Sequence, residues 1–286
     1  MAKILAIGIA TLDIINTVEK YPNEDDEIRV VSQRKARGGN ATNTLAVLSQ
    51  LGHQCSWAGV LINEPDAKTI QHDLEQFKID TRPCTILSEG KMPTSYISHS
   101  VETGSRTIVH HRDCPEFSFA DFVKINHQQY DWIHFEGRNI AETAQMLTWL
   151  KQHHPNIACS LEIEKSRPDI ESLFQLPQLL MFSQHYATTV GYNSAQALLA
   201  SLPNHLNATC TWGKQGAWAL TNGDIIHHQA CPPEKVIDTL GAGDTFNAAL
   251  ISALLQQQNL SQAVEQACHL AGKKCGQLGF VDLITK

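Results

Sequence analysis

The sequence has no long apolar run, and this absence argues against two classes of protein. No stretch approaches the roughly 18 consecutive apolar residues that a membrane-spanning helix needs. The first apolar run, residues 4–9, is also too short and too soon interrupted to be a secretion signal. We therefore expect a cytoplasmic protein with no membrane partner.

Positive charge is scarce as well. The 286 residues contain 22 Lys and Arg against 29 Asp and Glu, a formal net charge of -7. Proteins that bind nucleic acid usually carry a basic patch or stripe, so we expect no nucleic-acid partner. An anionic substrate would have to be bound by a local group of basic side chains or backbone N–H groups.

The eight cysteines and 14 histidines do not form the spacings of a metal site. There is no C-x-x-C, and only Cys268 and Cys275 come near one. A chain of this length can build its own hydrophobic core, so we expect reduced, mostly buried thiols. There is no H-E-x-x-H, and adjacent histidines on a strand point to opposite faces. No metal ligand can be assigned from the sequence.

Two common nucleotide-binding motifs are also missing. The chain has no G-x-x-x-x-G-K-[ST] loop and no G-x-G-x-x-G after an early strand. A nucleotide would have to be bound by some other arrangement of backbone and side chains.

Short apolar runs alternate with amphipathic segments along the chain. Continuous apolar runs suit strands that are covered on both faces, and their alternation with helices is typical of an α/β fold with a mostly parallel sheet. We predict one domain over residues 1–286. The predicted strands are residues 4–9, 55–61, 132–135, 157–163, 179–182 and 209–212. The predicted helices include residues 43–51, 141–150 and 246–255.

Two stretches interrupt this alternation. Residues 14–31 carry two apolar pairs around a polar middle, and residues 94–99 and 106–111 form a hairpin pattern. We expect both stretches to form a small antiparallel sheet that stands off the main body as a lid. Its segments would be approximately 12–32 and 89–114. Edge strands of the main sheet are the alternative.

The most specific motif is D-T-L-G-A-G-D at residues 238–244, just before the predicted helix at 246–255. Gly241 and Gly243 let the backbone turn tightly and approach a ligand closely. The first turn of a helix has free N–H groups, which suit a phosphate, and it stabilises a carboxylate such as Asp244. The alternative is an ordinary capped helix N-terminus.

This string and the segment R-G-G-N-A-T-N at residues 37–43 resemble the two signatures of the ribokinase-like (PfkB-type) carbohydrate kinases. The resemblance runs from Ile4 to Phe280 and is closest to the ketohexokinase (fructokinase) branch. It implies a three-layer α/β/α core with a mostly parallel sheet and a small antiparallel β lid. The segments that match this branch include Y-P at 21–22, R-T-I-V at 106–109, E-G-R-N at 136–139 and A-G-K-K-C-G at 271–276.

The resemblance implies a sugar site made by Asp13, Gly39, Asn40, Asn43 and Asp244. Asp13 follows the first strand, at the end of a sheet where α/β proteins bind ligands. Asparagine amides offer both donors and acceptors, which suits a polyol. Asn40 has an alternative interpretation as a helix N-cap.

The resemblance also implies an ATP site, with magnesium as cofactor and with potassium as a possible one. Arg106 on the lid would bind phosphates through paired hydrogen bonds, unless it is a solvated strand residue. The N-x-x-E element that organises magnesium in many relatives is replaced by S-Q-H-Y at residues 183–186. Glu162 and Glu164 would support the metal through water or would be charge partners. The ATP-binding residues implied are Arg106, Gly213, Lys214, Gln215, Gly216, Gly241 and Gly243.

The reaction implied is transfer of the ATP γ-phosphoryl group to a sugar, giving fructose 1-phosphate from fructose. Asp244 would accept the hydroxyl proton, while the Gly241, Ala242 and Gly243 backbone and Arg106 stabilise phosphate charge. A kinase for another sugar or a nucleoside is one alternative. A phosphorylated sugar would need a basic cluster such as the one at residues 34–37, and a non-catalytic binding protein on the same scaffold is a further alternative.

The lid also carries an expectation about assembly. Exposed lid strands with apolar faces tend to pair, and a two-fold dimer is the commonest symmetric result. The resemblance implies a homodimer through these strands, in which Asp25 reaches the sugar of the partner subunit.

Overall fold

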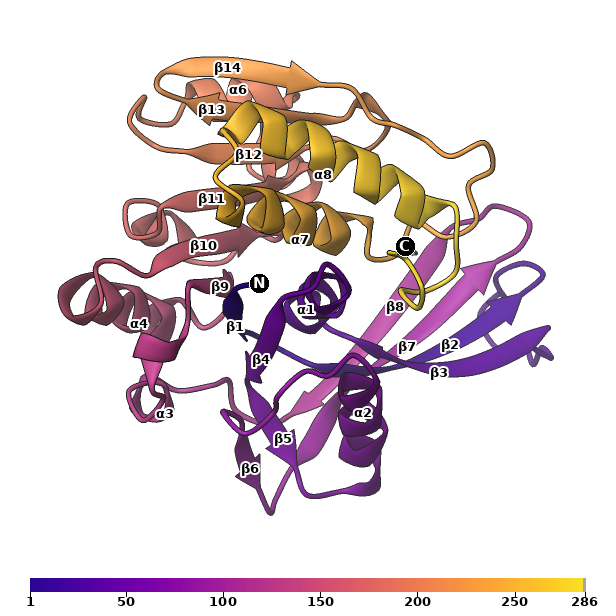
Figure 1. Ribbon diagram of the computed structural model, residues 1–286. Helices are drawn as coiled ribbons and strands as arrows, with labels where there is room; N and C mark the ends of the chain where they lie inside the picture. Colours follow the sequence, from indigo (N-terminus) through magenta and orange to yellow (C-terminus); the bar gives the residue numbers. More distant parts are fainter. Residues whose placement is uncertain (285–286) are drawn as a thin grey trace.

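The computed structural model describes residues 1–284 and has an eight-stranded sheet at its centre (Figure 1). Its strands are β1 (Lys3–Ile7), β4 (Gln54–Ala58), β9 (Trp132–Glu136), β10 (Ala158–Ile163), β11 (Leu179–Ser183), β12 (Ala208–Thr211), β13 (Ala217–Thr221) and β14 (Asp224–His228). The spatial order is β14-β13-β12-β11-β10-β9-β1-β4. The six neighbouring strands from β12 to β4 in this order run parallel, whereas β13 and β14 are antiparallel additions at one edge. The six strands predicted from apolar runs are all present, and the mostly parallel sheet is confirmed.

Helices cover both faces of this sheet and separate two hydrophobic cores. Strand β1 shows the division, because Ile4 and Ala6 pack into one core and Leu5 and Ile7 into the other. The helices of the first core are α1 (Asn40–Gln50), α2 (Pro65–Gln76), α7 (Ala242–Leu255) and α8 (Leu260–Cys275). The helices of the second core are α3 (Phe119–Phe122), α4 (Ile140–His153), α5 (Gln184–Thr189) and α6 (Ala195–Ala200). The three-layer α/β/α core is thus confirmed.

A separate four-stranded sheet projects to one side of the main sheet (Figure 1) and is called the lid below. Its strands are β2 (Thr11–Val18), β3 (Ser32–Gly38), β7 (Lys91–Ser100) and β8 (Arg106–Asp113), in the order β3-β2-β7-β8. The pairs β2/β3 and β7/β8 are antiparallel, but the central pair β2/β7 is parallel. The lid is therefore a mixed sheet built from two antiparallel pairs. The first predicted lid segment, approximately residues 12–32, ends where β3 starts, so almost all of β3 lies outside it.

Smaller elements complete the fold. Between β4 of the main sheet and β7 of the lid lie β5 (Val60–Ile62), α2 (Pro65–Gln76) and β6 (Thr85–Leu87). Three 3₁₀ turns precede strands of the main sheet: η1 (His127–Gln129), η2 (Ile170–Leu173) and η3 (Gly213–Gln215). None of the helices within residues 1–284 is both long and apolar enough to cross a membrane. All eight cysteines are free thiols, as predicted.

Candidate functional site

A cavity of about 610 Å³ lies between the carboxyl ends of the main-sheet strands, the lid and the start of α7. Strand ends β9, β10 and β11 contribute polar side chains, and the lid contributes alternate residues of β7 and β8, including Ile97 and Ile108. Seven of the residues predicted from sequence line this cavity: Asp13, Gly39, Asn40, Asn43, Gly241, Gly243 and Asp244. The topology thus brings together residues that are up to 231 positions apart (13 to 244).

Asp244 lies in the first turn of α7 and is 7% exposed. Gly241, the residue that caps this helix, has a φ of 78°, a conformation that glycine adopts without steric cost. The Asn43 amide donates a 2.8 Å hydrogen bond from Nδ2 to Asp244 Oδ2. The helix N-terminus and the buried carboxylate therefore face the same cavity.

The environment of the Asp244 carboxyl favours its protonated form. Burial raises the pKa of Asp244 to about 8, and the charges of Glu164 and Glu136 add to this effect. The hydrogen bond from Asn43 and the charge of Arg37 act in the opposite direction. A carboxyl with such a pKa titrates near neutral pH, which is the range in which a general base works best.

A buried arginine fixes the orientation of Asn43. Arg37 Nη1 donates to Asn43 Oδ1 at 2.7 Å and to Thr42 Oγ1 at 2.9 Å, and its Nε pairs with Asp73. Because the Asn43 oxygen is occupied in this way, its NH₂ group is the end that points to Asp244. From sequence, Arg37 belongs to the R-G-G-N-A-T-N segment and to the basic cluster at residues 34–37, and neither predicts a buried role for it. Its place directly before two glycines was the one signal of a buried role.

Asp13 lies on β2 at the base of the lid and is also buried. Thr11 Oγ1 donates to its Oδ1 at 2.8 Å, and burial raises the pKa of this carboxyl. A Cβ at Gly38, on the paired strand β3, would lie 2.2 Å from Asp13 Oδ2. Gly38, in the R-G-G-N-A-T-N segment, therefore has to be a glycine to leave room for the Asp13 carboxylate.

Asn40 makes contacts that the sequence did not indicate. Its Nδ2 donates to Glu162 Oε1 at 3.2 Å and to Glu164 Oε2 at 3.1 Å. Helix α1 has Gly39 as its N-cap and no side-chain cap, so the alternative interpretation of Asn40 as the capping residue is wrong. Asn247, one helical turn after Asp244, also donates to Glu162 Oε1 at 3.1 Å.

Glu162 is buried, and its second carboxylate oxygen, Oε2, has no hydrogen-bond partner among the described residues. Burial raises the pKa of Glu162, and the charges of Asp244, Glu136 and Glu164 raise it further. A buried carboxylate oxygen without a partner is costly, unless a proton, a water or a cation satisfies it.

Glu136, at the end of β9, also lines the cavity, and the site prediction did not include it. Its Oε2 accepts from the Ile9 N–H at 2.9 Å, and its Oε1 lies 3.5 Å from Arg138 Nη1. Glu136 and Arg138 thus form a long ion pair, and Arg138 is closer to Glu116, at 3.0 Å. Burial raises the pKa of Glu136.

The other predicted residues lie outside the lining of this cavity. Arg106 is exposed on β8, with its Nη2 3.5 Å from Thr239 Oγ1 in the glycine-rich string. Ala242 is the first residue of α7. Asp25 is exposed in the loop between β2 and β3. The remaining four are Gly213, Lys214, Gln215 and Gly216, which form or follow η3, two positions after the cavity residue Thr211.

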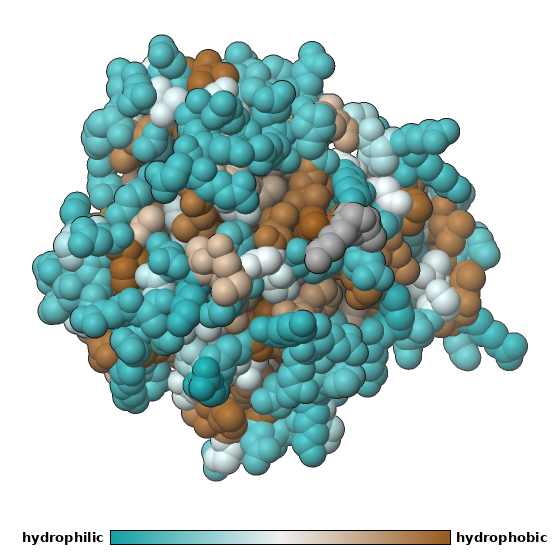
Figure 2. Space-filling view, in the orientation of Figure 1, coloured by the Kyte–Doolittle hydropathy of each residue, from teal (hydrophilic) through white to brown (hydrophobic). Residues whose placement is uncertain are grey.

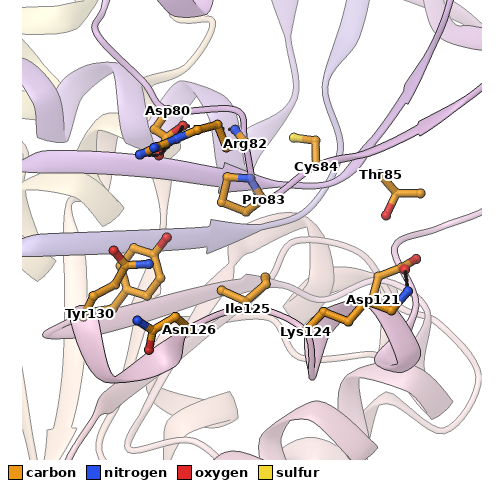
Figure 3. Close-up of a pocket in the computed structure, with 11 residues that line it drawn as sticks. Asp80, Arg82, Pro83, Cys84, Thr85, Asp121, Lys124, Ile125, Asn126 and Tyr130 are labelled. Atoms are coloured by element: carbon orange, nitrogen blue, oxygen red, sulfur yellow. Dashed lines mark hydrogen bonds and ion pairs between the residues drawn. The ribbon is translucent and has the colours of Figure 1, made fainter.

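A second cavity, of about 450 Å³, shares no lining residue with the first (Figure 3). Its charged side chains are already paired: Arg82 with Asp80 at 2.8 Å on one wall, and Lys124 with Asp121 at 2.7 Å on the other. These pairs leave no free charge to recognise a ligand. The first cavity is therefore the candidate functional site.

Comparisons with known proteins show the family of the chain. The model of the "pfkB family carbohydrate kinase" matches residues 1–285. Ketohexokinase from Mus musculus is 38% identical over 294 aligned residues, which cover 99% of each chain.

Two solved structures share the fold at lower sequence identity. The structure of a putative ribokinase from Agrobacterium tumefaciens has a TM-score of 0.85 at 21% identity, covering 98% of this chain and 93% of that one. Arabidopsis thaliana ribokinase complexed with ribose and ATP has a TM-score of 0.83 at 17% identity, covering 99% and 95%. The match over the full length and the site together lead to one conclusion: this chain belongs to the pfkB family of carbohydrate kinases.

Proposed function

We propose that this kinase uses ATP to phosphorylate fructose to fructose 1-phosphate, with Asp244 as the general base. The observation that carries this proposal is the position of Asp244. Its buried carboxylate lies at the N-terminus of α7 in the same cavity as Asp13 and Asn43. The 38% identity with mouse ketohexokinase supports fructose as the acceptor.

The sugar binds to the main-body side of the cavity. Asp13 accepts hydrogen bonds from sugar hydroxyls, and Asn40 and Asn43 supply both donors and acceptors. Gly39, with a φ of 106°, lets the backbone pass close to the sugar. The hydroxyl to be phosphorylated faces Asp244, which accepts its proton as the bond to phosphorus forms.

The phosphates of ATP bind at the start of α7. The N–H groups of Gly241, Ala242 and Gly243 lie where the positive end of the helix dipole stabilises negative charge. Arg106, which already reaches Thr239 from the lid, neutralises the transferred phosphoryl group. The turn made by Gly213, Lys214, Gln215 and Gly216 contacts the rest of the nucleotide, with Gly213 and Gly216 allowing close approach of the backbone.

The cavity also fits a magnesium ion bound with ATP. Carboxylate oxygen is the ligand that magnesium prefers, and Glu162 Oε2 is buried without a partner in the described structure. Glu162 and Glu164, directly or through water, would hold the ion, which when bound neutralises charge on the phosphates. Asn40 and Asn247 orient Glu162 for this role.

The lid supports a homodimer as the working assembly. Tyr96 and Val109 face each other across β7 and β8, and they are 49% and 65% exposed. They alternate with Ile97 and Ile108, which line the cavity, so they lie on the opposite face of the lid. Apolar side chains are visible over the lid in Figure 2. A second copy would cover them, and Asp25, which lies outside its own cavity, would reach the sugar of the partner subunit.

A panel of acceptors tests the proposed substrate. Purified protein is given ATP, magnesium and one acceptor at a time, and ADP release is followed by a coupled assay, with the product identified by NMR. Fructose should give the highest kcat/KM and fructose 1-phosphate. A higher value for ribose, a nucleoside or a phosphorylated sugar would replace fructose, and binding of both ligands without ADP release would overturn the catalytic proposal. Light scattering at micromolar concentration tests the dimer, and a monomer there would contradict it.

A further inference from the structure

One histidine in the wall of the cavity has no part in the mechanism above. His110 lies on β8 and lines the cavity from the lid. Successive residues of a strand point to opposite faces, so His110 shares the cavity face with Ile108, whereas Val109 and His111 lie on the other face. A histidine can donate and accept hydrogen bonds, and its partners decide which of the two it offers to a ligand.

Three polar side chains form a row across the lid at this point. Asp13 of β2 is paired in register with Ser95 of β7, and Ser95 is paired in register with His110 of β8. All three residues line the cavity. Directly paired residues on neighbouring strands point to the same face of a sheet. The row therefore runs along the cavity face, from the buried Asp13 to His110 on the edge strand of the lid.

Hydrogen bonds connect the members of this row. Ser95 Oγ lies 3.2 Å from His110 Nδ1. At the other end of the row, burial raises the pKa of Asp13, whereas hydrogen bonding from the hydroxyls of Thr11 and Ser95 lowers it. An ionised carboxyl group only accepts hydrogen bonds. Ser95 therefore donates its hydroxyl proton to Asp13 and accepts a hydrogen bond from His110 Nδ1.

This direction of the hydrogen bonds fixes the tautomer of His110. When the proton of the neutral imidazole is on Nδ1, the other ring nitrogen, Nε2, carries a lone pair and can only accept. Within residues 1–284, Nδ1 is the ring nitrogen that has a partner, and Nε2 has none. His110 is exposed, although Ser95 next to it is buried. Nε2 is therefore available to a ligand in the cavity.

The surroundings of the ring keep it neutral. Burial lowers the pKa of His110, and the positive charges of Arg138, Arg112, Lys165 and His111 lower it further. A neutral imidazole with a free acceptor nitrogen suits the hydroxyl of a sugar and does not suit an anion.

We infer that His110 is a specificity-determining residue of the sugar site, whose Nε2 accepts a hydrogen bond from one hydroxyl of the acceptor. Ser95 is the positioning residue that holds the ring in the required tautomer. The inference rests on the proposed binding of the sugar by Asp13, at the other end of the same row. The lid thus recognises one hydroxyl of the sugar, and a sugar without that hydroxyl is a poorer acceptor.

The first test compares four full-length proteins in the kinase assay with fructose. His110→Phe keeps a ring but has no acceptor atom, whereas His110→Gln places an amide oxygen near the position of Nε2. The control is His111→Phe, on the opposite face of the same strand. The KM for fructose should rise about 3–10-fold in His110→Phe, with kcat within about twofold of the unmodified protein, as expected for one lost hydrogen bond that binds substrate and transition state alike. His110→Gln should recover most of this loss, and the control should change less than twofold.

Deoxy analogues of fructose, each without one hydroxyl, identify the partner of His110. The unmodified protein should use one analogue about 3–10-fold less well than fructose in kcat/KM because of the lost bond to Nε2. In His110→Phe this difference between fructose and that analogue should disappear, since the bond is already absent. A merely structural role of His110 would lower activity with every sugar and leave all the differences in place. An unchanged KM in His110→Phe, or the same differences in both proteins for every analogue, would overturn the inference.

Ser95 gives a test of the positioning role. Ser95→Ala removes the group that fixes the tautomer, so the KM for fructose should rise about 2–5-fold. Ser95→Thr keeps the hydroxyl and should stay within twofold of the unmodified protein. Equal KM values for Ser95→Ala and the unmodified protein would contradict this role.

The inference and the proposed function fail separately. If the acceptor panel replaces fructose with another sugar, the same comparison is made with that sugar and its deoxy analogues. Calorimetry of sugar binding without ATP gives the comparison in the absence of turnover. A loss of binding in His110→Phe then supports the inference whatever the acceptor, and equal binding contradicts it while the result of the panel stands.

Discussion

The two sides of the cavity differ in how firmly their polar groups are held. On the main-body side, Asn43, Glu136 and Asp244 are buried, and each has a hydrogen-bond partner. On the lid side, β8 is exposed along most of its length and pairs only with β7. Arg106 has one long contact, at 3.5 Å.

Because of this difference, we expect the two sides of the cavity to have different functions. Groups that must already be oriented when the reaction starts are fixed by packing at strand ends and helix starts. The lid strand β8 is an exposed ribbon with few buried contacts, where local opening costs little free energy. Substitutions on the main-body side should therefore change chemistry or stability strongly, and substitutions on the lid should change ligand binding alone.

The largest expected effect is on the proposed base. Asp244→Asn keeps the shape of the side chain but removes the proton acceptor, so kcat should fall by about 10²–10⁴. Binding of sugar and ATP by calorimetry should change little. In the unmodified protein, kcat/KM should rise with pH through about 8, because the base must lose its proton to act. Near-normal turnover of Asp244→Asn would show that another group takes the proton.

Two glycines, Gly39 at the start of α1 and Gly104 in the lid turn between β7 and β8, test whether the main body is packed more tightly than the lid. Gly39 and Gly104 both have positive φ, 106° and 68°, but a Cβ at Gly39 would lie 2.1 Å from the Ile9 carbonyl oxygen, whereas one at Gly104 would meet nothing within 4 Å. Gly39→Ala should lower the free energy of unfolding by more than about 4 kcal/mol. Gly104→Ala, in the lid turn, should cost about 1 kcal/mol from backbone strain alone. Urea unfolding measures both, and equal losses would remove the contrast.

A buried histidine should make the main body sensitive to acid. His127 packs against Phe122 and Trp149, and neither ring nitrogen has a hydrogen-bond partner in the described structure. Burial, with a smaller effect of His154, lowers the pKa of His127 to about 4. The folded protein therefore keeps His127 neutral at pH values where the unfolded chain binds a proton. Its contribution to stability is full above about pH 6.5 and declines as the pH falls towards 4.

The comparison with His127→Phe separates the contribution of His127 from that of the buried carboxyls. Their pKa values are raised, so they stabilise the folded protein more as the pH falls, whereas His127 stabilises it less. The variant should gain stability over the unmodified protein by on the order of 3 kcal/mol between pH 6.5 and pH 4. Urea unfolding at a series of pH values measures the difference. If the difference in unfolding free energy between the two proteins stays constant with pH, His127 binds a proton as readily in the folded protein as in the unfolded chain, which would contradict the prediction.

The smallest expected effect is on the lid. Arg106→Ala should lower kcat/KM for ATP by about 10–100-fold, the cost of a lost charge-assisted hydrogen bond. The melting temperature should not change, because Arg106 is exposed. The matched control is Arg37→Ala at the buried end of β3, where the lid joins the main body; it leaves Asp73 without its buried partner and should cost about 3–5 kcal/mol of stability. A loss of stability in Arg106→Ala would place the lid among the rigid parts of the molecule.

The fold was accessible from the sequence for a physical reason. Parallel strands covered on both faces must be apolar at successive positions, so Leu179–Phe182 and Thr209–Trp212 stand out as short apolar runs. The pairing of strands in the lid was harder to predict. Strands β2 and β7 pair in parallel, although the end of β2 at Val18 and the start of β7 at Lys91 are about 73 positions apart (91 − 18). Local patterns of alternation indicate a strand but not its partner.

The site was predictable where backbone conformation dictates the residue. Gly39 and Gly241 are glycines because of their positive φ, and the motifs that contain them led to Asn43 and Asp244. Glu136 was not predicted as a site residue, and Glu162 was left open between support of the metal and a charge partner. The reason is that a carboxylate at the end of a strand looks the same in sequence whether it enters a cavity or pairs with a neighbour.

The sequence by itself determined the order of strands and helices, the two glycine-rich turns and the carboxylate at the start of α7, because each follows from local periodicity or backbone sterics. Only the tertiary structure decided which groups meet: Arg37 with Asn43, Asn40 with Glu162, and Lys274 with Asp238. These contacts join residues from 6 to 122 positions apart. No local rule of the chain specifies them, because they depend on how the layers pack and on where charge is excluded from water.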